Sequence, residues 1–289
     1  MPQPKRRSHE PRRTKDAEFH APRRRSLGGD QIEGRQAVKE LILARRRTVE
    51  YVWLEDSVVR KGIIAEIVDL CLARRIPLIT VSRRKFEMSV RSEGNQGILA
   101  RAAALREEDL TEMVNAVPNP FLLLIDGITD PHNLGAVLRS AELSGVTGVV
   151  LPQNRTSMIT PTVAKAAAGA VEHLSFALVP GIPSALMSLA TLGVYLVGLD
   201  VRGKTSVYNI ATGDTGRIAL VLGAEDKGLA RLSAERCDLL VRIPQVGRLD
   251  SLNVSAAAAV ALFEVSRLRS SGVEPTEKPE PVVGLEPTT

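Results

Sequence analysis

Aromatic side chains are scarce in this sequence: Trp, Tyr and Phe together make up 3% of its 289 residues. Proteins that grip single-stranded nucleic acid stack bases on several aromatic rings, so this scarcity excludes a binding surface built mainly from such rings. Any grip on nucleic acid must come mostly from basic side chains. Hydrophobic residues make up 44% of the chain, an ordinary share that excludes a fibre or a wholly disordered protein. At about 150 residues per domain, the length predicts roughly two domains.

Cysteine is equally scarce, because the chain holds only Cys71 and Cys237, which lie far apart with no CxxC spacing. This excludes a disulfide framework and a cysteine metal site, and it fits a reducing cytosol in which both thiols are small core residues. The phosphate-binding patterns GxxxxGKS/T and GxGxxG are also missing. The sequence therefore lacks the main evidence for a P-loop nucleotidase or an ordinary dinucleotide-binding enzyme.

No apolar run is long enough to span a membrane. Residues 174–199 carry no charge, but prolines and glycines interrupt them repeatedly between 180 and 193. A membrane-spanning helix needs about 20 consecutive apolar residues. We therefore expect a strand, a turn, a short helix and a second strand here, and no membrane partner.

Excess positive charge is concentrated at the start of the chain. Residues 1–29 have a net charge of +6 and residues 271–289 a net charge of −3, which leaves +2 for residues 30–270. We expect a disordered basic tail over 1–29 and a disordered, acidic, Pro-rich tail over 271–289. The basic tail suits contact with RNA phosphates, although a solubilising extension fits equally. It lacks the apolar stretch of a secretory signal, and its three acidic residues count against an organelle transit peptide.

The region after the basic tail predicts a small α/β domain over residues 30–105. Residues 106–118 contain acidic residues and prolines and predict a linker with a short helix. Within the domain, periodicity predicts helices over 34–46 and 60–74 and strands over 49–54, 78–81 and 97–101.

Residues 119–270 predict a second α/β domain with a mostly parallel sheet. Strands that are apolar along both faces and alternate with helices are typical of a parallel sheet covered on both sides. Ligands gather at the carboxyl ends of such strands, so the loops that follow them are the candidate sites. The predicted strands are 121–126, 148–152, 194–200, 218–223 and 239–244.

The first of three unusual loops covers residues 126–139. We expect a helix to begin near Asn133, with Asn133 as its N-cap and Arg139 about two turns further on, near the mouth of the strand end. A plain N-cap and a solvated arginine explain these two residues equally well.

The other two loops are 222–228 and 243–255. Gly223 and Gly228 suit a tight turn, which either a bound cofactor or a packed helix requires. The third loop ends with polar residues at the start of an alanine-rich helix, namely Ser251, Asn253 and Ser255. A capped, buried helix explains the alanines but not these polar groups, which need hydrogen-bond partners if they are buried.

Together and in this order, the three loops resemble the motifs of the SPOUT methyltransferases, in particular the SpoU or TrmH branch that methylates ribose 2′-oxygens in RNA. The matches are NxGxxxR at 133–139, LGAExxG at 222–228 and IPxxGxxxSLNVSxA at 243–257. Residues 30–101 resemble the L30-like substrate-binding domain of the enzymes that methylate guanosine in 23S rRNA. Their GRQAV and NQGILA segments lack two histidines that are frequent in that family, which affects no catalytic position.

The resemblance implies an α/β catalytic domain whose C-terminal segment forms a deep trefoil knot, a rare arrangement. It also implies S-adenosylmethionine as the cofactor, without a metal, held largely by backbone groups of the second and third motifs. The implied cofactor-binding residues are Leu222, Gly223, Ile243, Val246 and Leu252.

The resemblance further implies methyl transfer to a ribose 2′-hydroxyl, with Arg139 as the principal catalytic residue. A guanidinium holds its proton too strongly to be an easy base, so we favour Arg139 as a phosphate clamp that stabilises developing oxyanion charge. Lys165, in the segment 160–170, is a second candidate for phosphate contact. An ordinary solvent-exposed charge on a helix explains this residue equally well. The residues implied to position substrate and motif loops are Asn133, Glu225, Ser251 and Asn253.

The implied partners are large-subunit rRNA and a second copy of the chain, in the cytoplasm. The homodimer would pair through the helix that contains residues 256–259, and Arg139 would serve the partner's cofactor site. Alternatives are a tRNA or adenosine-rRNA 2′-O-methyltransferase of the same family, or a non-catalytic RNA-binding or ribosome-assembly protein. The L30-like domain counts against the minimal tRNA enzymes, and the complete set of motif residues counts against a decayed site.

Overall fold

The computed structural model describes residues 26–154, 156–210, 216–225, 227–248 and 251–270. The predicted tails lie outside these residues, except for 26–29 at the end of the basic tail. Here the structure differs from the prediction, because Leu27 is fully buried and the Gly29 amide donates a hydrogen bond to the Ile159 carbonyl at 2.8 Å. The folded chain therefore begins before residue 30.

The N-terminal unit is built on a four-stranded sheet with the strand order β1-β4-β2-β3. β4 runs antiparallel to both β1 and β2, whereas β2 and β3 are parallel. The strands are β1 (Gln31–Glu33), β2 (Val49–Glu55), β3 (Leu78–Val81) and β4 (Ile98–Ala102).

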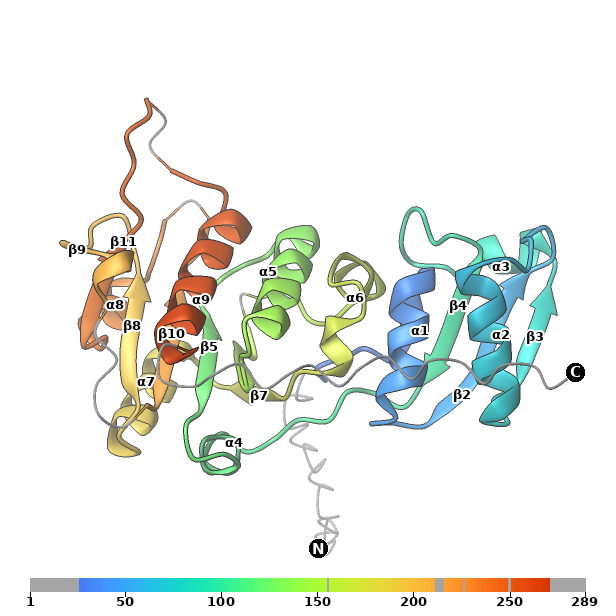
Figure 1. Ribbon diagram of the computed structural model, residues 1–289, viewed down its shortest axis with the longest axis horizontal. Helices are drawn as coiled ribbons and strands as arrows, with labels where there is room; N and C mark the ends of the chain where they lie inside the picture. Colours follow the sequence, from blue (N-terminus) through green and yellow to red (C-terminus); the bar gives the residue numbers. More distant parts are fainter. Residues whose placement is uncertain (1–25, 155, 211–215, 226, 249–250, 271–289) are drawn as a thin grey trace, which may run out of the picture.

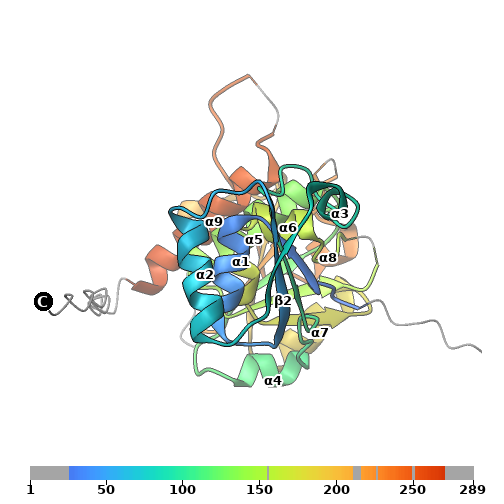
Figure 2. The ribbon, with the colours of Figure 1, turned by 90° about the vertical axis from the view of Figure 1, so that its right-hand side faces the viewer.

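Helices cover both faces of this sheet (Figure 2). α1 (Arg35–Ala44) and α2 (Ile63–Ala73) share a core with the strand residues Val52 and Leu54. The short helix α3 (Arg83–Glu87) packs on the opposite face through the buried Phe86 ring. The predicted small α/β arrangement is therefore confirmed, and the structure adds strand β1 and helix α3 to it.

The C-terminal unit contains a parallel seven-stranded sheet with the order β7-β6-β5-β10-β8-β11-β9. β5, β6 and β10 are buried along their whole length, which explains why their sequences show no polar alternation. The strands are β5 (Phe121–Ile125), β6 (Gly148–Pro152), β7 (Phe176–Val179), β8 (Tyr195–Leu199), β9 (Thr205–Ser206), β10 (Ile218–Leu222) and β11 (Leu239–Arg242).

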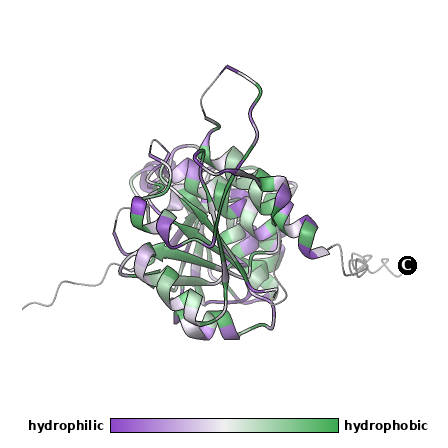
Figure 3. Cartoon of the chain, turned by 90° about the vertical axis from the view of Figure 1, so that its left-hand side faces the viewer, coloured by the Kyte–Doolittle hydropathy of each residue, from purple (hydrophilic) through white to green (hydrophobic). Residues whose placement is uncertain are grey.

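The helices of this unit lie on both faces of the sheet, which Figure 3 shows as largely hydrophobic strands between them. On one face, α5 and α9 lie side by side (Figure 1), and α6 packs against α5. On the other face, α4 and α7 share a second core with β5 and β10. The bounds are α4 (Leu110–Asn115), α5 (Pro131–Leu143), α6 (Pro161–Ala166), α7 (Ile182–Thr191), α8 (Arg231–Glu235) and α9 (Val254–Ser270), with 3-10 turns η1 (Ala170–Glu172) and η2 (Val207–Asn209).

One continuous hydrophobic core joins the two units, which stand side by side in Figure 1. An ion pair is buried in the junction: the Arg47 and Glu172 side chains are 6% and 1% exposed, and Arg47 Nε donates to Glu172 Oε2 at 2.9 Å. Arg47 Nη1 also donates to the Ala103 carbonyl at 2.6 Å. Because buried charges must be paired, this arrangement fixes one unit against the other.

Candidate functional site

Three loops that are far apart in the sequence meet at the carboxyl edge of the parallel sheet. The Asn133 Nδ2 group of α5 donates a hydrogen bond to Glu225 Oε1, after β10, at 2.7 Å. The Asn253 Nδ2 group, before α9, donates to Asn133 Oδ1 at 3.1 Å. One residue from each sequence motif thus belongs to a single hydrogen-bonded chain.

The position of Asn133 differs from the prediction. α5 begins at Pro131, and its N-cap is Asp130, whose carboxylate accepts a hydrogen bond from the His132 amide at 3.0 Å. An aspartate followed by proline is a strong helix start, since proline lacks the amide that the cap would have to satisfy. Asn133 therefore lies inside the first turn, where its amide is free to bridge Glu225 and Asn253.

Asn253 is held by the helix that follows it. Its Oδ1 atom accepts hydrogen bonds from the Ser255 amide at 2.8 Å and the Ser255 hydroxyl at 2.6 Å. The Asn253 carbonyl also accepts the Ala257 amide at 2.9 Å. With Oδ1 committed to α9, the Nδ2 group is aimed at Asn133, which explains why amide and hydroxyl residues crowd the start of an alanine-rich helix.

A cavity of about 440 Å³ opens beside this hydrogen-bonded chain, and we name it the three-loop cavity. It is lined by residues 199–202, 222–225, 227–228 and 242–243, and by residues of the 245–257 segment. Its volume lies in the range of small-molecule sites. Six of the predicted site residues line it: Leu222, Gly223, Glu225, Ile243, Ser251 and Leu252.

The structure does not bring Val246 into this cavity. Val246 is fully exposed in the segment between β11 and α9, which projects from the body of the molecule in Figure 1. Ser251 and Leu252 lie where the same segment returns to α9 and lines the cavity. The role of Val246 in cofactor binding stays a prediction.

Gly223 is needed by the shape of the loop. A Cβ atom at this position would lie 2.1 Å from the Gly228 carbonyl carbon, a contact that only displacement of the backbone could relieve. Ala224 and Gly228 exchange two backbone hydrogen bonds of 3.0 Å, which close the loop on itself. The tight turn expected from the two glycines is therefore present, and it forms one wall of the cavity.

Sequence reasoning missed Asp200 and Arg202, which also line the three-loop cavity. The buried Asp200 carboxylate accepts hydrogen bonds from Arg202 Nε at 2.8 Å and from the Leu229 amide at 3.0 Å. The Arg202 guanidinium holds the pKa of Asp200 below its ordinary value. A signal was available, because Asp200 is the last residue of the predicted strand 194–200, whose carboxyl end faces the ligand edge.

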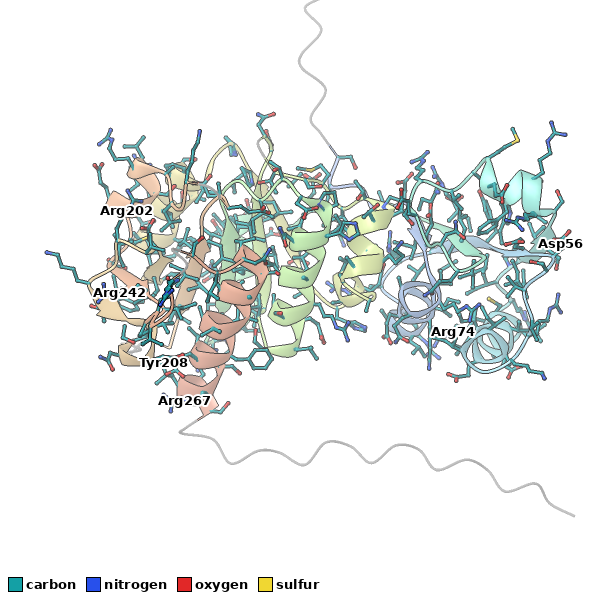
Figure 4. The ribbon with its side chains drawn as sticks, turned by 90° about the horizontal axis from the view of Figure 1, so that it is seen from above. Asp56, Arg74, Arg202, Tyr208, Arg242 and Arg267 are labelled. Atoms are coloured by element: carbon teal, nitrogen blue, oxygen red, sulfur yellow. The ribbon has the colours of Figure 1, made fainter. Side chains whose placement is uncertain are left out.

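Positive charge gathers at this end of the molecule. Figure 4 shows Arg202 and Arg242 at the end opposite Asp56 and Arg74 of the N-terminal unit. Arg202, Arg242 and Lys227 line the three-loop cavity. Among the described lining residues these three cations outnumber the two carboxylates, Asp200 and Glu225, by one, and Arg202 is paired with Asp200. The small positive excess favours a polyanionic substrate.

Arg139 and Lys165 lie away from this cavity. Arg139 is exposed on α5 and, within the described residues, makes no hydrogen bond or ion pair with another side chain. Lys165 lies at the junction between the units, where its ammonium donates a hydrogen bond to the Glu93 carbonyl. Arg139 is thus free to meet another molecule, whereas Lys165 already has a structural partner.

The described residues contain no group of three or more His, Cys, Asp or Glu side chains that could hold a metal ion. In the same residues, no helix is long and apolar enough to cross a membrane.

Comparison with known proteins gives relatives over nearly the whole folded chain. The 23S rRNA (guanosine-2′-O-)-methyltransferase of Photobacterium profundum is 35% identical over 249 residues, which are 84% of this chain and 99% of that protein. The enzyme of the same name from Escherichia coli K12 is 39% identical over 198 residues, covering 67% of this chain and 80% of that protein.

The fold is also that of a known structure. The SpoU methyltransferase AviRb from Streptomyces viridochromogenes, solved in complex with AdoMet, has a TM-score of 0.69 and 22% identity, covering 84% of this chain and 91% of that one. Residues 31–108 match the family described as RNA 2′-O ribose methyltransferase substrate binding. Residues 120–263 match the SpoU rRNA Methylase family, and with relatives of this identity and coverage the chain belongs to it.

Proposed function

We propose that this protein transfers a methyl group from S-adenosylmethionine to the ribose 2′-hydroxyl of a guanosine in 23S rRNA. The observation that supports this most directly is the hydrogen-bonded chain Glu225–Asn133–Asn253 beside the three-loop cavity. We infer the substrate from the relatives named above as 23S rRNA guanosine-2′-O-methyltransferases.

The three-loop cavity fits the cofactor. Its floor combines apolar side chains of Leu222, Ile243 and Leu252 with the backbone of the glycine-closed loop 223–228, and its polar lining includes Glu225 and Asp200. An apolar pocket with a few convergent polar groups is the usual form of a small-molecule site. S-adenosylmethionine, when bound, supplies a methyl group activated by its sulfonium charge.

The protein's own residues orient the acceptor. In the transfer, the 2′-oxygen would form a bond to the methyl carbon as the bond between that carbon and the sulfonium sulfur breaks, and the hydroxyl proton would pass to solvent. Holding the hydroxyl in line accounts for much of such catalysis. The locked amides of Asn133 and Asn253 form a rigid frame at this position, and Ser251 lines the cavity beside them. Arg139 would hold the target phosphate and stabilise the developing oxyanion.

Arg139 acts across a homodimer interface in this proposal. Its lack of a partner on α5, next to the α9 face, supports contribution to the site of a second copy. The test mixes Arg139→Ala chains with Gly223→Arg chains, in which the backbone contact at Gly223 disables the cofactor loop. Random pairing makes about half of the dimers mixed, and each mixed dimer keeps one complete site of two. Activity should therefore return to about a quarter of the normal value. Mixed dimers without activity would place Arg139 in its own chain's site.

Ribose-methylation mapping tests the activity itself. Purified protein, labelled S-adenosylmethionine and unmethylated rRNA should give one 2′-O-methylguanosine in 23S rRNA. Methylation of tRNA alone would favour the tRNA alternative, and a folded protein that binds no S-adenosylmethionine would favour a non-catalytic RNA-binding role.

Several finer features belong to the same proposal. The N-terminal unit docks on folded rRNA. In the sequence it is followed by the linker 106–118 and the catalytic domain 119–270. The C-terminal segment forms the trefoil knot, which is consistent with three separate loops closing over one cavity. The protein acts in the cytoplasm, because its proposed substrate is ribosomal RNA.

A further inference from the structure

A second cavity, of about 560 Å³, lies at the carboxyl ends of β5, β6 and β7. We name it the proline cavity, because Pro152, Pro180 and Pro183 line it together with Asp126, Asn154 and the segment Ala230–Leu232. No residue of the three-loop cavity lines it, and nothing in the proposed transfer reaction uses it.

The proline cavity is connected to the reaction site through adjacent residues. Asp126 lines the proline cavity, and its neighbour Gly127 lines a smaller cavity of about 230 Å³. That smaller cavity shares Ala224, Glu225 and Lys227 with the three-loop cavity. The three hollows therefore follow one another along the carboxyl edge of the sheet, and the smaller cavity, which Gly127 and Glu225 line, lies between the two larger ones.

Asp126 supplies a fixed carboxylate, and it shares the largely apolar lining with two other polar side chains, those of Asn154 and Arg231. Its amide donates to the Leu222 carbonyl at 2.8 Å, which anchors its backbone, and its Oδ2 atom accepts the Ser233 hydroxyl at 2.7 Å. An ionised carboxylate can accept about four hydrogen bonds, so capacity remains on Oδ1 and Oδ2. Within the described residues no other group bonds to the Asp126 carboxylate.

The charges favour an uncharged occupant over a phosphate. Asp126 would repel it, and the one cation that lines the cavity, Arg231, is paired with Glu235 at 2.6 Å. The apolar walls formed by prolines and Ile182 suit a flat ring instead, since bases removed from a stack are held between apolar surfaces.

A carboxylate distinguishes guanine from the other bases. Guanine presents two adjacent donors, N1–H and the N2 amino group, which match two carboxylate oxygens in parallel. Adenine and cytosine place an acceptor nitrogen beside their amino group, and uracil has one N–H between two carbonyls. A carboxylate therefore pairs fully with guanine alone.

We propose that the proline cavity binds the guanine base of the nucleotide whose ribose is methylated, with Asp126 accepting hydrogen bonds from N1 and N2. This inference rests on the proposed function, and it adds a determinant of base specificity. The ribose would lie at the smaller cavity between Gly127 and Glu225, next to the cofactor.

The test uses Asp126→Asn, which keeps size but replaces one acceptor by a donor. On an rRNA fragment with guanosine at the target, kcat/KM should fall by about 10- to 100-fold, while the Kd for S-adenosylmethionine stays unchanged. Inosine at the target, which lacks the N2 amino group, should lower the kcat/KM of the normal enzyme. It should not lower the kcat/KM of Asp126→Asn any further. If the losses of kcat/KM caused by Asp126→Asn and by inosine multiplied when the two changes were combined, the proposal would be overturned.

Two variants separate base recognition from disturbance of the fold. Ser233→Ala removes the other partner of Asp126 but leaves the carboxylate in the cavity, so it should methylate normally. Gly181→Phe should block the cavity; a Cβ there meets nothing nearer than Pro183 Cδ at 3.9 Å, so the backbone tolerates it. Loss of activity in Ser233→Ala equal to that in Asp126→Asn would indicate a structural role for Asp126.

A binding experiment makes the result independent of methyl transfer. Ligand-observed NMR with the full chain, saturated with S-adenosylhomocysteine to fill the proposed cofactor cavity, should detect GMP but not AMP or CMP, and Asp126→Asn should abolish the GMP signal. Equal binding of GMP and AMP, or unchanged GMP binding in the variant, would refute guanine recognition. If GMP binds as expected but no rRNA is methylated, the proposed function fails while the base cavity stands.

Discussion

At the scale of single residues, Asp200 shows how one buried carboxylate shapes the cofactor loop. It receives two hydrogen bonds from the Arg202 side chain and one from the Leu229 amide, directly after the loop 223–228. Arg202 lowers the pKa of Asp200 in the folded protein, so folding favours its ionised form. Such a contribution is complete above the unfolded pKa of about 3.9 and is lost as the pH falls through the lower folded value.

Asp200→Asn should therefore lower the free energy of unfolding by about 1.5–3 kcal/mol at pH 7, because hydrogen bonds to a charged group are lost. The difference from the normal protein should shrink below about pH 4, where the unfolded carboxyl becomes protonated. Urea denaturation at pH 7, 4 and 3 measures both effects. As a control, Asp30→Asn removes a part-exposed ion pair with Arg101 and should cost under about 1 kcal/mol. A pH-independent difference for Asp200→Asn would contradict the linkage.

At the scale of elements, α5 depends on a close approach to α6. A Cβ at Gly135 would lie 2.5 Å from the Ala166 Cβ and 2.8 Å from the Val163 carbonyl oxygen. Gly135→Ala gains about 1 kcal/mol of helix propensity but forces the helices apart. We expect a net loss of about 1–3 kcal/mol in urea denaturation. Arg139→Ala, exposed on the same helix, should change stability by less than about 0.5 kcal/mol. Stabilisation by Gly135→Ala would show that α6 shifts freely.

At the scale of the whole molecule, the shared core and the Arg47–Glu172 pair predict that the two units unfold together. Glu172→Gln leaves Arg47 buried without its charge partner and should cost about 3–5 kcal/mol. When urea denaturation is monitored by hydrogen exchange in each unit, both units of the normal protein should unfold in one transition. Glu235→Gln breaks an exposed pair and should have almost no effect. Two separate transitions in the unaltered protein would contradict this coupling.

The start of the folded chain gives a second prediction at this scale. Removing residues 1–25 takes away nine basic side chains and should weaken RNA binding and flatten its salt dependence, with the methylated position and stability unchanged. Removing residues 1–29 should also destabilise the fold, because Leu27 is fully buried and such side chains contribute about 2–5 kcal/mol. Salt titrations and urea denaturation of both truncations separate the two effects. Equal stability of the two truncations would show that Leu27 contributes nothing.

Much of this protein could be predicted from its sequence, because apolar periodicity records which faces are buried. It determined the parallel sheet, the strand–turn–helix–strand pattern of 174–199, and the three loops in which Asn133, Glu225 and Asn253 stand. Those loops belong to strands whose carboxyl ends share one edge, so their meeting followed from the fold class. The family motifs then pointed to the cavity that Leu222, Gly223 and Ile243 line.

Only the tertiary structure decided features that depend on contacts between distant segments. Asp130 rather than Asn133 caps α5, which frees the Asn133 amide for Glu225. Lys165 donates to the Glu93 carbonyl across the junction, and Leu27 is buried although no other large apolar side chain stands near it in the sequence. Local patterns report burial and backbone preference within one segment. Which hydrogen-bond partner a side chain meets is set by how segments about 100 residues apart are packed together, and no single segment carries that information.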